Sequence, residues 1–200
     1  MRSLFLLCAL LLTAPAALAA KTILIMGDSL SAGYGIQPNQ AWPALLAQRL
    51  QAQRLDYNVA NFSISGETTA GGRSRLAKAL TEQRPALLIL ALGANDGLRG
   101  LPLNQMRDNL QAMITAGQAA GAKVMLVGMR LPPNYGPYAE DFANTFQQLA
   151  QTSKLAWQPF LLEPIISRPE LFQADQLHPR AEAQPLLLDH LWPTLRPLLK

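Results

Sequence analysis

Short apolar runs recur along the chain at intervals of about 30 to 40 residues, and they constrain the fold more than any other feature. The first four are TILIM (22–26), YNVANF (57–62), ALLILAL (86–92) and VMLVGM (124–129), and WQPFLL (157–162) is a shorter fifth candidate. None alternates strictly between apolar and polar residues, which is typical of strands in a parallel sheet covered by helices on both faces. The runs therefore predict a parallel sheet of four or five strands.

The segments between these runs have the period of amphipathic helices. Apolar residues at helical spacing are Trp42, Leu45, Leu46 and Leu50; then Met106, Leu110, Met113, Ile114 and Gly117; then Phe142, Phe146 and Leu149. We expect Asn104 to cap the second of these helices, and a closing helix in 181–199 to be interrupted or ended by Pro193 and Pro197. Alternating strands and helices predict an open, doubly wound α/β sandwich with right-handed crossovers.

Residues 1–19 have the pattern of a secretory signal peptide. Arg2 precedes an uncharged apolar stretch, and the small-x-small sequence Ala17-Leu18-Ala19 provides a cleavage site. The apolar stretch is shorter than the roughly 20 residues that a membrane-spanning helix needs. We therefore expect export to the periplasm or the medium without a stable membrane anchor, and a single domain over residues 20–200. Cleavage would remove Cys8, the single cysteine, which excludes disulfides and a cysteine nucleophile from the mature chain.

The charge balance indicates no polyanionic partner. The formal net charge is +4, and the chain has no block of five like charges. The densest basic group, formed by Arg73, Arg75 and Lys78, falls at helical spacing and is expected to be a solvated helix face. Nucleic acid is therefore not expected as a partner.

Polar residues follow the carboxyl ends of the expected strands. GDS (27–29) follows the first run, SISGETT (63–69) the second, GANDG (93–97) the third, and ADQLHPR (174–180) precedes the closing helix. Ligands of doubly wound sheets bind outside the carboxyl ends of the strands, so these four segments are expected to share one cleft.

Each residue in these segments also has a structural interpretation. Ser29 could cap a helix, Gly66 could serve a turn, and Asn95 could be a left-handed turn residue before Gly97. The chain has two histidines, of which His190 falls inside the leucine-rich closing helix and is expected to be a surface or satisfied core residue.

The remaining histidine, His178, follows Asp175 by three positions, and this pair suggests acyl-transfer chemistry. A carboxylate can hold an imidazole in one tautomer, and the imidazole can then take the proton of a serine hydroxyl. The backbone N–H groups of Ser29 and Gly66 and the side-chain amide of Asn95 could converge as donors to an oxyanion. We expect Asp28 and Asp96, beside these residues, to brace their loops rather than to transfer protons.

These segments resemble the SGNH hydrolases, an esterase family named for its serine, glycine, asparagine and histidine. GDSL (27–30), SISGETT, GAND (93–96) and DQLHP (175–179) are similar to four ordered blocks of that family. GDSLSAGYGI, LGANDGLRG, LPPNYG and HPRAEAQP are similar to its bacterial periplasmic thioesterase, lysophospholipase and arylesterase subgroup. Gln176 and Arg180 depart from the family, in which a glycine or acidic residue and an asparagine are common at these positions.

The resemblance implies a flavodoxin-like three-layer α/β/α sandwich with a five-stranded parallel sheet. It implies Ser29 as nucleophile, His178 as base and Asp175 as its partner, with Ser29, Gly66 and Asn95 forming the oxyanion hole. No metal or organic cofactor is expected. The implied activity is hydrolysis of esters and thioesters through an acyl-enzyme, on a small-molecule substrate with an acyl chain. We expect the chain to act as a monomer.

The sequence leaves the substrate open. Apolar residues of the expected loops could line an acyl groove or cover the core; they are Leu30, Leu98, Leu131, Pro132, Pro133, Tyr135, Phe172 and Leu177. The main alternative is a carbohydrate O-acetyl esterase of the same family, whose cleft should be more polar, and another is a non-catalytic binding protein. A nucleotide-binding domain is disfavoured, because Pro38 stands where the third glycine of the fingerprint would be.

Overall fold

Five strands alternate with helices through the part of the chain that the structure describes. The structure is a computed structural model that describes residues 20–199, so the predicted signal peptide lies outside the described residues. The strands are β1 (Lys21–Gly27), β2 (Tyr57–Asn61), β3 (Leu87–Ala91), β4 (Lys123–Val127) and β5 (Ala156–Gln158). The α-helices are α1 (Ser29–Ala32), α2 (Trp42–Ala52), α3 (Thr69–Gln83), α4 (Ala94–Leu98), α5 (Leu103–Ala119), α6 (Pro137–Thr152) and α7 (Gln184–Leu195).

The strands form one parallel sheet in the order β2-β1-β3-β4-β5. β1 is an interior strand, and its Ile23 pairs with Val59 of the edge strand β2 on one side and with Leu87 of β3 on the other. The chain moves outward from β1 in one direction to β2 and then in the other to β3, β4 and β5. This is the doubly wound order with its reversal at β1, so the predicted flavodoxin-like sandwich is confirmed.

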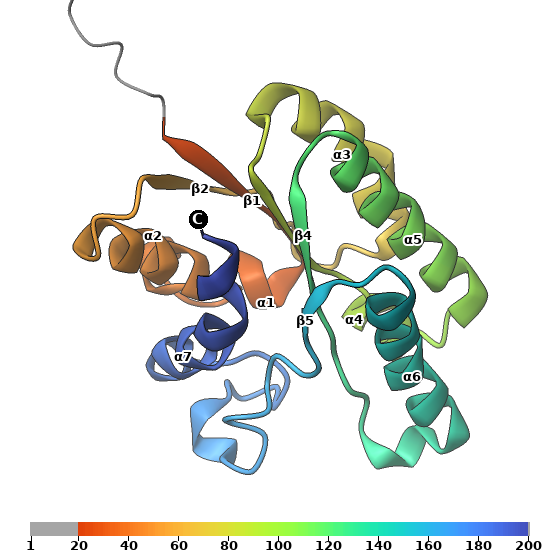
Figure 1. The fold of residues 1–200 in the computed structure, drawn as a ribbon. Helices are drawn as coiled ribbons and strands as arrows, with labels where there is room; N and C mark the ends of the chain where they lie inside the picture. Colours follow the sequence, from red (N-terminus) through yellow and green to blue (C-terminus); the bar gives the residue numbers. More distant parts are fainter. Residues whose placement is uncertain (1–19, 200) are drawn as a thin grey trace, which may run out of the picture.

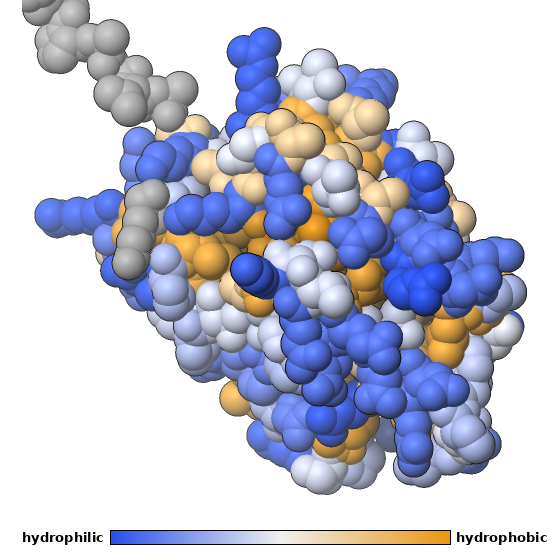
Figure 2. All heavy atoms as spheres, turned by 45° about the vertical axis from the view of Figure 1, so that its right-hand side comes forward, coloured by the Kyte–Doolittle hydropathy of each residue, from blue (hydrophilic) through white to orange (hydrophobic). Residues whose placement is uncertain are grey.

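Helices cover both faces of the sheet, as Figure 1 shows. α3, α5 and α6 pack side by side on one face, and α2 and α7 pack together on the other with α1. The face that carries α3, α5 and α6 is mostly hydrophilic on its outside, with hydrophobic side chains visible between the polar ones (Figure 2). The core between the layers includes the fully buried Trp42, Phe142 and Phe146, all from predicted helix faces.

Several boundaries differ from the sequence prediction. β5 ends at Gln158 rather than continuing to Leu162, because Pro159 has no N–H to donate to a neighbouring strand. The cap predicted at Asn104 is wrong, because α5 begins at Leu103 with Pro102 in the cap position. α7 continues through Pro193 and ends at Leu195, two residues before Pro197, so only the second proline lies beyond the α-helix.

Within residues 20–199, no helix has both the length and the apolar composition that crossing a membrane requires.

Candidate active site

Ser29 lies just beyond the carboxyl end of β1, as the first residue of α1. β1 ends at Gly27, and Asp28 caps α1 by accepting the backbone N–H of Leu30 on its Oδ1 at 3.0 Å. The expected bracing role of Asp28 is therefore confirmed, and Ser29 is not the cap. The helix ends after one turn at Gly33. This tight strand-to-helix connection holds Ser29 at the carboxyl ends of the strands, where doubly wound folds bind their ligands.

A hairpin-like loop before α7 carries Asp175 and His178. Its two sides meet at an antiparallel bridge between Phe172 and Pro179. At its tip, Asp175 Oδ1 accepts the backbone N–H groups of Leu177 at 2.9 Å and His178 at 3.0 Å. Gln176, one of the departures from the family pattern, directly follows Asp175 in this turn. Its φ is +55°, a conformation that glycine adopts more readily. The aspartate thus shapes the turn that presents the histidine.

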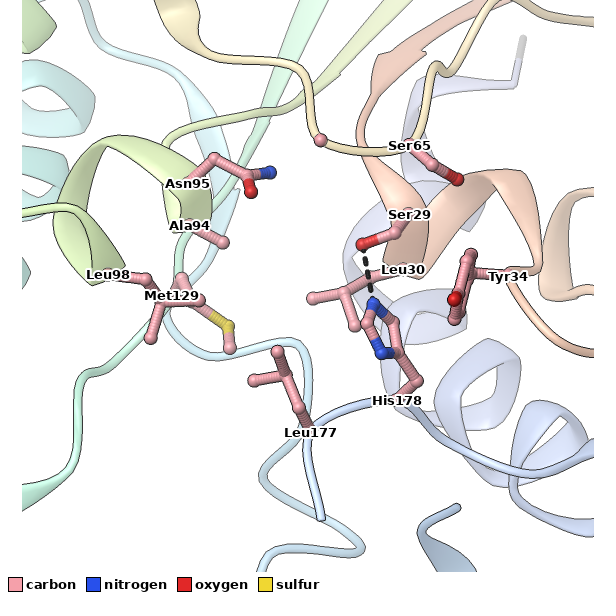
Figure 3. A pocket seen from close by; sticks show the side chains of 11 residues that line it. Ser29, Leu30, Tyr34, Ser65, Ala94, Asn95, Leu98, Met129, Leu177 and His178 are labelled. Atoms are coloured by element: carbon pink, nitrogen blue, oxygen red, sulfur yellow. Dashed lines mark hydrogen bonds between the residues drawn. The ribbon is translucent and has the colours of Figure 1, made fainter. Parts of the chain in front are cut away.

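The side chains of Asp175, His178 and Ser29 form one hydrogen-bonded line. His178 Nδ1 lies 2.7 Å from Asp175 Oδ2. His178 Nε2 lies 2.9 Å from Ser29 Oγ, the contact that the dashed line in Figure 3 marks. A carboxylate can only accept, so the proton of the neutral imidazole is on Nδ1 and Nε2 is free to accept the serine hydroxyl. The structure therefore brings together three predicted residues that are up to 149 positions apart.

The carboxyl group of Asp175 is stabilised in its charged form. Hydrogen bonds from the backbone N–H and the ring of His178, and then from the N–H of Leu177, lower the pKa of Asp175 to about 2. The carboxylate is thus ionised at neutral pH and suited to fix the imidazole tautomer.

Gly66, in the loop after β2, and Asn95, in α4, line the same pocket as Ser29. Gly66 follows β2 with φ +79°, and a Cβ there would meet only the end of Arg99 at 3.7 Å, so the backbone angle rather than space requires glycine. Asn95 is in α4, after β3, and its Nδ2 donates to the Glu67 carbonyl oxygen at 3.0 Å. An amide has two N–H bonds, so this contact fixes the side chain and leaves a second donor. In Figure 3 the Asn95 amide and Ser29 border the same hollow.

Two polar contacts hold these loops in place. The buried Asp96 accepts the hydroxyl of Thr69 at 2.6 Å and its backbone N–H at 2.8 Å, which ties α4 to the start of α3 and confirms the bracing role expected of Asp96. Arg75 binds the Glu67 carboxylate through Nε at 2.6 Å and is partly buried. The expectation of a solvated basic face is therefore wrong for Arg75, while Arg73 and Lys78 are exposed.

His190 contributes nothing to this site. Its Nε2 lies 2.7 Å from Gln158 Nε2 and 3.0 Å from the Phe160 carbonyl oxygen. It is a hydrogen-bonded structural histidine, as predicted.

A cavity of about 150 Å³ opens at the serine, and a larger, mainly apolar cavity of about 370 Å³ lies next to it. Leu98, Met129 and Leu177 line both, so the two cavities are direct neighbours. Seven of the eight apolar residues predicted for a groove line one or both of them; Tyr135 does not, and its hydroxyl donates to the Leu98 carbonyl oxygen instead.

The sequence did not single out Tyr34, Ser65 or Met129 at the serine, or Phe160, Leu162 and Ile166 in the larger cavity, because apolar and small residues in loops carry no chemical signature.

The fold and site together define a doubly wound α/β protein with a Ser-His-Asp line at the carboxyl edge of its sheet. Residues 25–185 match the GDSL-like lipase/acylhydrolase family. The chain belongs to this family, as its resemblance to the SGNH hydrolases predicted, and it is an ester hydrolase.

Individual relatives agree with this assignment. The chain is 49% identical over 182 residues to esterase TesA of Pseudomonas aeruginosa, covering 90% of each chain. It is 40% identical over 184 residues to thioesterase 1/protease 1/lysophospholipase L1 of Escherichia coli, covering 92% of this chain and 87% of that protein. A crystal structure of TesA superposes with a TM-score of 0.87 at 48% identity, covering 90% of this chain and all of that one.

Proposed function

We propose that the chain is an exported serine hydrolase that cleaves carboxylic esters and thioesters of acyl chains through an acyl-enzyme on Ser29. The single observation that carries this proposal is the 2.9 Å contact between His178 Nε2 and Ser29 Oγ, in line with the Asp175 carboxylate. A serine hydroxyl is a weak nucleophile until an adjacent base accepts its proton, and this geometry supplies that base.

In the proposed cycle Ser29 Oγ attacks the substrate carbonyl carbon while His178 Nε2 takes the hydroxyl proton. The carbonyl oxygen becomes an oxyanion, for which the N–H groups of Ser29 and Gly66 and the Asn95 amide are the proposed donors. Collapse of the tetrahedral intermediate breaks the bond to the leaving group, which receives the proton from His178. A water molecule, deprotonated by His178, then attacks the acyl carbon. The bond to Ser29 Oγ breaks, the acid is released, and Oγ takes the proton back from His178. Each oxyanion donor typically contributes about 2.7 to 4 kcal/mol.

The larger cavity supports an acyl chain as the substrate's apolar part. Its lining is mainly aliphatic and aromatic, and it shares Leu98, Met129 and Leu177 with the cavity at the serine. Burying each methylene of an acyl chain there would contribute about 0.8 kcal/mol. The relatives named esterase, thioesterase and lysophospholipase agree with this class of substrate. A carbohydrate O-acetyl esterase would be expected to line this space with polar groups instead.

Turnover of nitrophenyl esters from acetyl to dodecanoyl, and of a matched acyl-CoA, by wild type and Ser29→Ala tests the proposal. We expect kcat/KM to rise with chain length over several methylenes, and Ser29→Ala to lower kcat by at least about 10³-fold. Retained turnover in Ser29→Ala would exclude the mechanism. Activity confined to acetyl esters and acetylated glycans would favour the carbohydrate esterase, and ligand binding without turnover would favour a binding protein.

Export is part of the proposal and depends on the pattern of residues 1–19. The intact mass of the protein recovered outside the cytoplasm should correspond to a chain that begins at Ala20. A full-length chain retained in the cytoplasm would contradict it.

A further inference from the structure

A glutamine links the loop that carries His178 to the loop that follows Ser29. Gln173 Nε2 donates to the Tyr34 carbonyl oxygen at 2.7 Å, across 139 residues of sequence, and to the Pro179 carbonyl oxygen at 3.2 Å. The Gln173 backbone N–H donates to the His178 carbonyl oxygen at 2.8 Å. One residue therefore fixes the neck of the histidine loop and attaches it to the nucleophile loop.

Gly35 makes room for this contact. Its φ is +76°, and a Cβ at this position would lie 2.1 Å from Gln173 Oε1. The amide of Gln173 therefore lies directly against the backbone of Gly35. No side chain other than hydrogen would allow this approach, so the glycine and the glutamine form a matched pair.

The side chain of Tyr34 contacts the imidazole of His178 directly. Its ring centroid lies 4.5 Å from that of His178, with the planes inclined by 41°. Figure 3 shows the Tyr34 ring beside the imidazole, opposite the open part of the pocket. Tyr34 is half exposed, so burying its own ring does not explain this position. An aromatic ring here restricts rotation of the imidazole and attracts the imidazolium that forms when Ser29 gives up its proton.

We propose that Gln173 and Tyr34 form a clamp that holds the His178 imidazole at hydrogen-bonding distance from Ser29. Both are positioning residues, because neither is required to touch the reacting atoms. The proposal rests on the proposed function, in which His178 is the base. Without the clamp, the histidine loop keeps its internal turn through Asp175 but loses its direct attachment to the nucleophile loop. The expected consequence is a lower rate of the chemical steps rather than weaker substrate binding.

Gln173→Ala and Gln173→Glu test the clamp. The glutamate keeps the size of the side chain but removes the donor to Tyr34 and Pro179, so both variants should lower kcat about tenfold to a hundredfold on a short nitrophenyl ester, with KM within about twofold of wild type. Gln118→Ala, the same truncation at an exposed position of α5, is the matched control and should leave kcat within about twofold. Tyr34→Ala should lower kcat at least about threefold, and Tyr34→Phe, which keeps the ring, should lower kcat less than Tyr34→Ala does.

A double-mutant cycle separates positioning from general loosening of the fold. If Gln173 acts through His178, Gln173→Ala should have no further effect on residual turnover in a His178→Ala background. Wild-type kcat in both Gln173 variants, or an equal loss with and without His178, would overturn the clamp. A fully active His178→Ala would instead overturn the proposed function, so the two failures are distinguishable.

Discussion

At the scale of single residues, Asp28 combines deep burial with a carboxyl group. Its side chain is 2% exposed and directly precedes Ser29. Burial raises the pKa of Asp28 to about 6 from its ordinary value of 3.8, against the opposing effects of the Leu30 N–H and the charge of His178. The Oδ1 atom of this buried carboxyl group caps α1 and so helps to present Ser29.

This raised pKa predicts a pH-dependent stability difference between wild type and Asp28→Asn. The folded chain binds the Asp28 proton more tightly than the unfolded chain does. The free energy of unfolding of wild type therefore falls as pH rises from about 3.8 to about 6, and the asparagine variant lacks this fall. Relative to wild type, Asp28→Asn should gain about 2 kcal/mol between pH 4 and pH 7. Urea unfolding of both proteins at the two pH values measures the difference, and a constant difference would contradict the prediction.

At the scale of elements, helices approach the sheet closely where they carry glycine. Gly117 of α5 lies on the buried face that the helical spacing predicted, and a Cβ there would be 2.7 Å from Leu88 Cδ2 and 3.1 Å from Val124 Cγ2. The backbone of α5 thus packs directly on β3 and β4.

Gly117→Val should therefore destabilise the fold by about 1 to 3 kcal/mol, since the added side chain overpacks against two strands. Ala119→Val, on the exposed side of the same helix, introduces the same side chain without the clash and should lose less than about 1 kcal/mol, the helix-propensity difference between alanine and valine. Chemical denaturation compares the two. Equal stability of the variants would mean that α5 can shift away from the sheet without cost.

At the scale of the whole molecule, the sheet brings four distant segments to one edge, and most of this could be predicted from the sequence. Apolar runs without alternation predicted a parallel sheet. Because ligands of doubly wound sheets bind at the carboxyl ends of the strands, the sequence also predicted one cleft that contains Ser29, Gly66, Asn95 and the Asp175–His178 loop. The shortness of β5 and the start of α5 depend on which backbone groups find partners, which periodicity does not encode. The Gln173–Tyr34 contact was missed because it joins a polar side chain to a backbone carbonyl 139 residues away.

The central claim, a nucleophilic Ser29 activated by His178, is tested most directly by the mass of the covalent adduct formed with a serine-directed organophosphonate. The account predicts one adduct per chain, located on the peptide that contains Ser29, with activity lost in proportion to labelling. His178→Ala should label at least about 10³-fold more slowly. Full inactivation with the adduct on another residue, or undiminished turnover by a chain fully labelled at Ser29, would contradict the account.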